Sequence, residues 1–278
     1  WWCECSAPGG ALSPAATKAY DARVIHALRF RSGYPARLPG IRTRTLRFGE
    51  RINIVFGPNG AGKSTMLGAI AGAAGCRDGG WSDTSFALDA DASLAGTERR
   101  EPIGTDYETD LYRARLTWDE RPVFYQDCYA ESETSFLNEG YLESREFLRS
   151  TGEKRIGLIN ELITNVEERF LTYKLPRHVR PTLVLDEVDN HVGFVGQAVL
   201  WSEIIPHLAK KYQLIVATHS VFPLLLRRDN PQRTDVLFEL TESYSRQCLD
   251  SLAEAIEYYN EHGDGADIAE MPPGADAF

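Results

Sequence analysis

The residues best suited to do chemistry form a glycine-rich stretch that ends in a lysine and two hydroxyl side chains. This stretch fits the phosphate-binding pattern G-x-x-x-x-G-K-[ST] without a mismatch. Its glycines would let backbone N–H groups curl around phosphate oxygens, while the lysine reaches the β- and γ-phosphates and the first hydroxyl binds Mg²⁺. The alternative is a glycine-rich turn that binds nothing. The residues are Gly57, Pro58, Asn59, Gly60, Ala61, Gly62, Lys63, Ser64 and Thr65.

Two adjacent acids, Asp186 and Glu187, end an apolar run at 182–187. Carboxylates are costly in a buried strand unless they face a ligand. Successive side chains of a strand point in different directions, so the two acids can have different roles. We predict that Asp186 holds Mg²⁺ through water and that Glu187 is the general base for an attacking water. A strand that simply ends in a polar turn is the alternative.

The segments around these residues have the properties that a phosphate-binding loop requires. Residues 51–56 form a short apolar run that predicts a buried strand, and residues 66–71 are rich in Ala and Leu, which favours a helix. The helix N-terminus would add partial positive charge at the phosphates. Continuous apolar runs at 182–187 and 213–220 predict strands that are buried on both faces, as in a parallel sheet.

Other elements follow from periodicity and from turn residues. Residues 77–110 contain few apolar residues and predict loops and short strands over the nucleotide site. The further predicted strands are 24–30, 41–48, 111–117, 122–127 and 236–240, with a turn at 34–40. The further predicted helices are 139–149, 156–173, 195–210 and 247–259.

Composition indicates one large α/β domain or two small ones, since the chain has 278 residues and 43% of them are hydrophobic. No run of 18 apolar residues exists, so we expect no membrane span. The N-terminus lacks the pattern of a signal peptide. Five cysteines are present, and the pair Cys3 and Cys5 is only a weak indication of a metal site. We therefore expect a cytoplasmic protein.

The net charge of −10 is unevenly distributed along the chain. Residues 250–278 contain acids but no Lys or Arg, which predicts a solvated helix face followed by a disordered tail. Residues 21–51 show the reverse, with only Asp21 and Glu50 as acids. This segment is either an ordinary polar sheet face or a surface for a nucleic-acid backbone. Its arginines are Arg23, Arg29, Arg31, Arg37, Arg42, Arg44, Arg47 and Arg51.

Taken in order, the motifs resemble those of ABC-type ATPases. Residues 57–65 resemble the Walker A loop and residues 182–187 the Walker B motif. Residues 124–127 resemble the Q-loop, residues 150–154 the signature motif and residues 217–220 the switch region. The similarity extends over roughly residues 23–240.

The resemblance implies roles for four further residues. Gln126 would be a ligand of Mg²⁺ and water, and His219 would contact the γ-phosphate. A histidine at a strand end is otherwise more often a satisfied core residue. Ser150 and Gly152 would bind the nucleotide held by an opposite subunit, although the same residues could instead cap a helix.

The chain is most similar to the soluble SMC/RecF branch of these ATPases, which includes AAA family ATPases and the overcoming-lysogenization-defect proteins. The residues that carry this similarity are 28–32, 52–60 and 189–191. In that branch Arg31 and Ser32 would lie beside the nucleotide. The chain has no room for a coiled coil and lacks a recognisable Toprim nuclease domain.

We therefore predict an α/β fold of the P-loop NTPase class, with a mostly parallel sheet core, an N-terminal antiparallel β lobe and a small helical lobe. The expected layout is an irregular arm at 1–20, one ABC-like ATPase domain at 21–262 and an acidic tail at 263–278. The expected activity is ATP hydrolysis with ATP and Mg²⁺, in a homodimer that forms on ATP.

Three uses of this cycle stay open. The first is a DNA-associated ATPase of repair or genome defence. The second is a regulatory ATPase that controls a separate effector protein, such as a nuclease or toxin. The third is the energy subunit of a transporter, which the short segment between Gln126 and Ser150 makes the least favoured.

Overall fold

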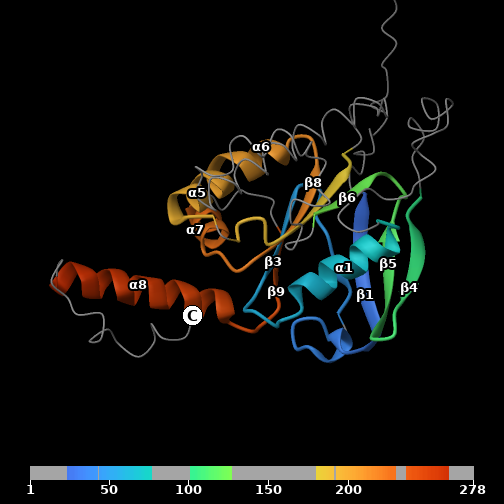
Figure 1. The fold of residues 1–278 in the computed structure, drawn as a ribbon, viewed down its shortest axis with the longest axis horizontal. Helices are drawn as coiled ribbons and strands as arrows, with labels where there is room; N and C mark the ends of the chain where they lie inside the picture. The colour runs from blue at the N-terminus through green and yellow to red at the C-terminus, as the bar shows by residue number, and fades with distance from the viewer. Residues whose placement is uncertain are drawn as a thin grey trace, which may run out of the picture.

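The computed structural model describes residues 24–42, 44–76, 101–126, 180–190, 192–229 and 236–262. These residues form two sheets with helix α1 (Lys63–Ala73) between them (Figure 1). The apolar side chains of α1 pack against both sheets in one buried cluster. The predicted α/β class, with a parallel core and an antiparallel lobe, is confirmed.

A parallel sheet forms the core, and its strand order is β6-β7-β8-β3-β9. All four neighbouring pairs run parallel. Every residue of β3, β7 and β8 is buried, as expected for strands covered on both faces. The five strands are β3 (Ile52–Phe56), β6 (Val123–Gln126), β7 (Thr182–Asp186), β8 (Gln213–Thr218) and β9 (Val236–Glu239).

An antiparallel sheet covers the other side of α1, in the order β2-β1-β5-β4. Its inner face is apolar and belongs to the cluster around α1. One prediction for this region is wrong. The strand predicted at 41–48 is reduced to β2, because hydrogen bonds from Ile41, Arg42 and Arg44 to preceding carbonyls form turns. The strands are β1 (Ile25–Gly33), β2 (Leu46–Arg47), β4 (Ile103–Glu108) and β5 (Tyr112–Trp118).

β4 lies in a segment that was predicted to form loops and short strands over the nucleotide site. It is a six-residue edge strand of the antiparallel sheet, which agrees with the prediction of a short strand. Most of its side chains are exposed, so the sequence lacks the apolar alternation of a half-buried strand. Pairing with β5 over its whole length stabilises it.

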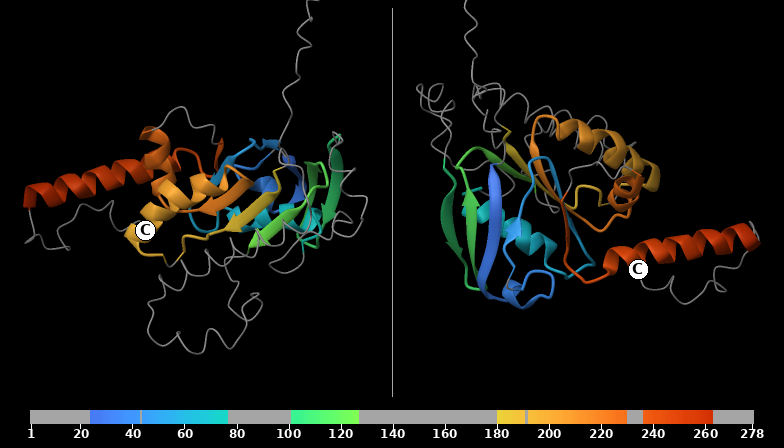
Figure 2. Two further views of the ribbon diagram at one scale, coloured as in Figure 1. Left: turned by 90° about the horizontal axis from the view of Figure 1, so that it is seen from above. Right: turned by 180° about the vertical axis from the view of Figure 1, so that it is seen from behind.

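Helices cover the far face of the parallel sheet (Figures 1 and 2). The helix predicted at 195–210 is interrupted by a π-helical turn, η4, whose end lies just before Pro206. Proline lacks an N–H and clashes with the carbonyl four residues earlier, which accounts for the local change in hydrogen bonding. These elements are α5 (Phe194–Val199), η4 (Leu200–Ile204), α6 (Ile205–Leu208) and α7 (Phe222–Asp229), the last of which was not predicted. The short helix η1 (Pro35–Arg37) packs instead against β1 of the antiparallel sheet.

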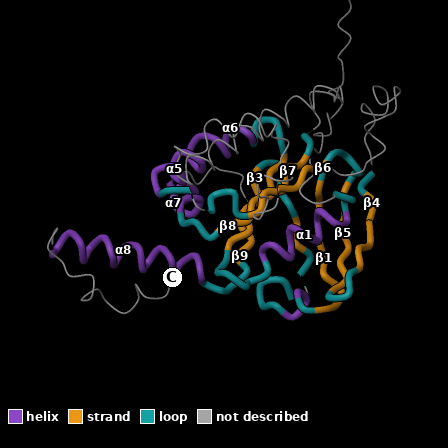
Figure 3. The backbone as a smooth tube through the Cα atoms, viewed as in Figure 1, coloured by secondary structure: helices purple, strands orange, loops and turns teal. Residues whose placement is uncertain are grey.

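Helix α8 (Tyr244–His262) is longer than predicted and projects away from the two sheets (Figure 3). None of the helices in the described ranges is long and apolar enough to cross a membrane. Several predictions lie outside the described residues: the arm at 1–20, the helices at 139–149 and 156–173, and the tail at 263–278. The pair of cysteines near the N-terminus lies outside them as well.

One buried side chain, Gln213 at the start of β8, joins the two sheets. Its Oε1 accepts hydrogen bonds from the backbone N–H groups of Val24 and Ile25, at 3.2 and 2.8 Å, and from the Thr182 hydroxyl at 2.8 Å. Its Nε2 donates to the carbonyls of Ile25 and Gly49, both at 2.8 Å. Gln213 is fully buried, so no water can replace these partners.

We expect Gln213→Leu to lower the free energy of unfolding by at least about 3 kcal/mol, because it leaves several buried backbone groups without partners. Urea denaturation followed by circular dichroism measures this change. Gln247→Leu on the exposed side of α8 is the matched control and should change stability by less than about 0.5 kcal/mol. An unfolding midpoint for Gln213→Leu equal to that of the native protein would contradict the role of this side chain.

Candidate active site

The phosphate-binding loop runs from the end of β3 to the start of α1. Gly60 and Gly62 have φ values of +78° and +94°, a conformation that glycine adopts readily and other residues rarely. A Cβ at Gly62 would also lie 2.5 Å from Leu38 Cδ1. The Tyr34 hydroxyl donates to the Gly60 carbonyl at 3.0 Å, a contact that the sequence did not predict. The glycines are therefore required by the backbone path of this loop.

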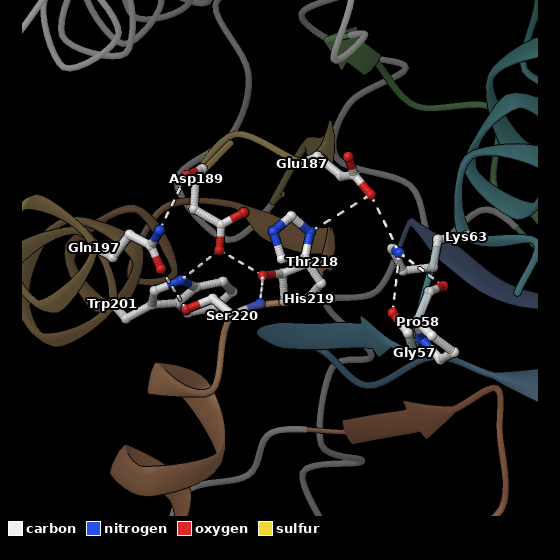
Figure 4. Close-up of polar contacts among 10 residues, drawn as sticks. All are labelled: Gly57, Pro58, Lys63, Glu187, Asp189, Gln197, Trp201, Thr218, His219 and Ser220. Carbon is white, nitrogen blue, oxygen red and sulfur yellow. Dashed lines mark hydrogen bonds and ion pairs between the residues drawn. The ribbon is translucent and has the colours of Figure 1, made fainter. Parts of the chain in front are cut away.

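Lys63 is the first residue of α1, and its side chain is only 3% exposed. Its Nζ donates to the carbonyls of Gly57 and Pro58, at 3.0 and 3.2 Å, and lies 3.2 Å from Glu187 Oε1 (Figure 4). An ammonium group has three N–H donors, so these contacts account for all of them. The loop thus holds a buried cation whose third partner is the predicted general base.

Glu187 follows β7 in an unusual backbone conformation, with a φ of +46°. Its N–H donates to the Ala217 carbonyl, and its carbonyl accepts from the Asn190 N–H. A non-glycine residue in this region costs about 1–3 kcal/mol. The turn directs the carboxylate toward Lys63, while Asp186 stays 1% exposed at the strand end. That the two acids point in different directions stays a prediction.

His219 directly follows β8, and its side chain lies near the carboxylate of Glu187. Its Nδ1 lies 3.9 Å from Glu187 Oε1, which is longer than a hydrogen bond, and its side chain is 43% exposed. The alternative that His219 is a satisfied core histidine is therefore wrong. Because β3, β7 and β8 are parallel neighbours in register, their carboxyl ends bring Lys63, Glu187 and His219 together.

The sequence did not indicate a hydrogen-bonded group that lies behind His219. Its members are Asp189, Gln197, Trp201, Thr218 and Ser220. Asp189 is 2% exposed, and its Oδ2 accepts hydrogen bonds from the Thr218 hydroxyl and from Trp201 Nε1, the latter at 3.0 Å. Burial raises the pKa of Asp189, although these hydrogen bonds and the nearby His219 oppose the rise. The Ser220 hydroxyl also pairs with Gln197 Oε1 at 2.8 Å. Residues 189–191 contributed to the family resemblance, but the sequence did not show that Asp189 is buried and hydrogen-bonded, because both depend on the tertiary fold.

The predicted magnesium ligands come from three elements at this edge. Asp186 ends β7, Gln126 ends the neighbouring strand β6, and Ser64 is the second residue of α1. Carboxylate, amide and hydroxyl oxygens suit Mg²⁺, so this donor set fits the ion. Within the described ranges, no group of three His, Cys, Asp or Glu side chains could hold a metal.

Two other predicted residues are not joined to this cluster by a described contact. Arg31 forms an ion pair with Asp106 on β4, at 3.5 Å, and Ser32 is exposed beside it. Their expected position beside the nucleotide stays a prediction. Tyr34, a little further along, makes the contact with the loop. Ser150 and Gly152 lie outside the described residues.

The model of a protein family described as an AAA domain matches residues 39–247. The chain belongs to this family. The match includes β3, the phosphate-binding loop, β7 and β8, which carry the cluster just described. The protein is therefore a P-loop ATPase of the AAA type, and both the predicted fold class and the predicted enzymatic activity are confirmed.

The AAA-domain chain is also similar to the cytochrome c biogenesis ATP-binding export protein CcmA of Nitrobacter winogradskyi. The two sequences are 27% identical over 176 residues, which make up 62% of this chain and 80% of the relative. This similarity agrees with the resemblance of the motifs to ABC-type ATPases.

We expect Glu187→Gln to lower kcat for ATP hydrolysis by at least about 100-fold, because the amide cannot accept a proton from water. ATP binding should persist, since the substitution keeps the shape of the side chain. Phosphate release and equilibrium binding of a fluorescent ATP analogue measure the two effects. Glu242→Gln, at an exposed turn, is the control and should hydrolyse ATP normally. Native kcat in Glu187→Gln would rule out Glu187 as the base.

Proposed function

We propose that this ATPase hydrolyses ATP at the cluster of Lys63, Glu187 and His219, forms a homodimer on ATP, and couples the cycle to work on nucleic acid in DNA repair or genome defence. The observation that carries the nucleic-acid part is a face of the antiparallel sheet that is rich in arginine. The dimer is supported by exposed apolar side chains on α5, which begins a few residues after Glu187.

In the proposed reaction, water attacks the γ-phosphate in line with the leaving group. Lys63 neutralises charge on the phosphates, Glu187 accepts the proton of the water, and His219 contacts the γ-phosphate. A bound Mg²⁺, held by Ser64, Gln126 and Asp186, would supply further neutralisation of phosphate charge. Lys63 and Glu187 are paired at 3.2 Å, so a γ-phosphate would compete with the carboxylate for the same ammonium group.

The arginine face consists of the outward side chains of the antiparallel sheet. Its only acids within the described residues are Asp106, paired with Arg31 and Arg115, and Glu108, paired with Arg113. Arg29 lies directly opposite Arg115 in the strand register, and like charges in that position destabilise a sheet. A bound polyanion would relieve this repulsion. The face comprises Arg29, Arg31, Arg47, Arg113 and Arg115.

The apolar patch of α5 begins soon after Glu187. Phe194, Val195 and Val199 are 68%, 77% and 40% exposed, and clustered exposed apolar groups favour contact with another protein surface. A second copy is the occupant that the resemblance to ABC-type ATPases favours, because Ser150 and Gly152 of one subunit would then complete the site of the other. ATP would stabilise the dimer through its higher affinity for that state.

We expect the arginine face to bind duplex DNA with an affinity that falls steeply as salt rises, because phosphate contacts release counterions. Fluorescence anisotropy of a labelled duplex in the presence of ATP measures this. Arg29→Ala with Arg47→Ala should weaken binding and reduce the salt slope by roughly 0.9 for each phosphate that the variant no longer neutralises.

Lys210→Ala with Arg246→Ala is the matched control for that experiment, since it removes the same charge from other elements. It should bind DNA nearly as the native protein does. If both pairs of substitutions have the same effect, or if the native protein does not bind, the nucleic-acid part of the proposal is wrong.

We expect light scattering to show a dimer for Glu187→Gln with ATP and Mg²⁺, because the bound nucleotide is not consumed. Lys63→Ala should stay monomeric through weak nucleotide binding, and Ser150→Arg through a blocked interface. Val195→Glu should bind ATP as a monomer, whereas Ile256→Glu on the distant α8 should dimerise normally. A monomeric Glu187→Gln at saturating ATP, or a dimer that ignores ATP, would contradict the switch.

Two other functions have an observation in their favour. An effector protein bound by a regulatory ATPase could use α8, where Ile256 and Tyr259 are 53% and 56% exposed. The similarity to an ATP-binding export protein favours a transporter subunit. If the protein hydrolyses ATP but does not bind DNA, one of these two functions would be favoured over work on nucleic acid.

A further inference from the structure

The carboxylate of Asp189 is firmly held through one oxygen while the other, among the described residues, has no hydrogen-bond partner. Oδ2 accepts from Thr218 and Trp201, as described above. Oδ1 is buried and receives no hydrogen bond from the part of the chain that the structure describes. A buried carboxylate oxygen without a donor is costly. The arrangement therefore indicates a donor that engages Oδ1 in another state of the protein.

His219 is the side chain placed to be that donor. Figure 4 shows its imidazole ring between the carboxylates of Asp189 and Glu187. The charge of His219 acts on Asp189, since it opposes the rise in the pKa of that acid. The contact of His219 with Glu187 is 3.9 Å long, so Glu187 does not fix the ring by a hydrogen bond. The ring can thus move toward a stronger acceptor.

Hydrogen bonds to Asp189 and Thr218 also fix the backbone on both sides of His219. The Thr218 hydroxyl that donates to Asp189 also accepts from the Ser220 N–H at 2.8 Å. Trp201, the second donor, belongs to the π-helical turn η4, and such turns occur frequently at functional sites. These hydrogen bonds therefore fix Asp189 and the two sequence neighbours of His219, Thr218 and Ser220, relative to one another.

We propose that Asp189 is a positioning residue for His219, which donates a ring N–H to Asp189 Oδ1 once nucleotide draws Lys63 and Glu187 apart. This hydrogen bond fixes the orientation of the imidazole toward the γ-phosphate. The inference rests on the proposed contact of His219 with the γ-phosphate. It adds a residue that touches neither nucleotide nor water and acts through the histidine alone.

The test is Asp189→Asn in the whole 278-residue chain, compared with His219→Gln and with the double variant. Asparagine can keep its oxygen as the acceptor for Thr218 and Trp201, and it then turns an NH2 group, which donates rather than accepts, toward His219. We expect kcat to fall between about 10- and 100-fold, as for other misplaced catalytic groups, while the affinity for ATP and the melting temperature stay close to native. The double variant should be no slower than His219→Gln alone.

Trp201→Phe provides a structural control, because it removes one hydrogen bond to Asp189 but leaves the carboxylate. It should lower the melting temperature with less than a threefold change in kcat. Native kcat in Asp189→Asn, or effects that multiply in the double variant, would overturn the positioning role. Native kcat in His219→Gln would instead overturn the proposed contact of His219 with phosphate, which separates the two failures.

Discussion

The buried charge of Lys63 is the constraint around which the site is arranged. A cation with a side chain that is 3% exposed must find all of its partners inside the protein. Two come from the loop carbonyls, and this requires the left-handed glycines that fold the loop back over the lysine. The third comes from Glu187, which follows the strand β7, and this requires the strained turn at that residue.

The same constraint explains the sheet. Lys63 and Glu187 are distant in sequence, and the parallel sheet brings their segments to a common edge, because β3 and β7 both pair in parallel with β8. Gln213 holds the opposite end of β8 through five hydrogen bonds, three of which go to Val24 and Ile25 at the start of the antiparallel sheet. The site end of the sheet is thus held by electrostatics, and the other end by neutral hydrogen bonds that do not depend on nucleotide.

The sequence was most informative where local pattern and function coincide. The loop, the buried strands and the acids at 186–187 all carry signals within a few residues, and the structure brings Lys63, Glu187 and His219 together as expected. Tyr34, Asp189 and Gln213 gave no such signal, because each acts through partners that are brought close only by the fold. The bounds of strand β4 were not predicted, because this strand depends on pairing with β5 rather than on its own alternation.

Positive and negative side chains are concentrated at opposite sides of the molecule, which gives it an electric dipole. The arginine face lies on the antiparallel sheet, whereas α8 projects from the other side of the molecule and carries Asp250, Glu254, Glu257 and Glu261 against a single arginine (Figures 1 and 2). A molecule with a net charge of −10 would be repelled by a polyanion if that charge were uniform. Under the proposed binding of nucleic acid, this uneven field would turn the protein as it approaches, so that the sheet would lead and the helix would trail before any contact forms.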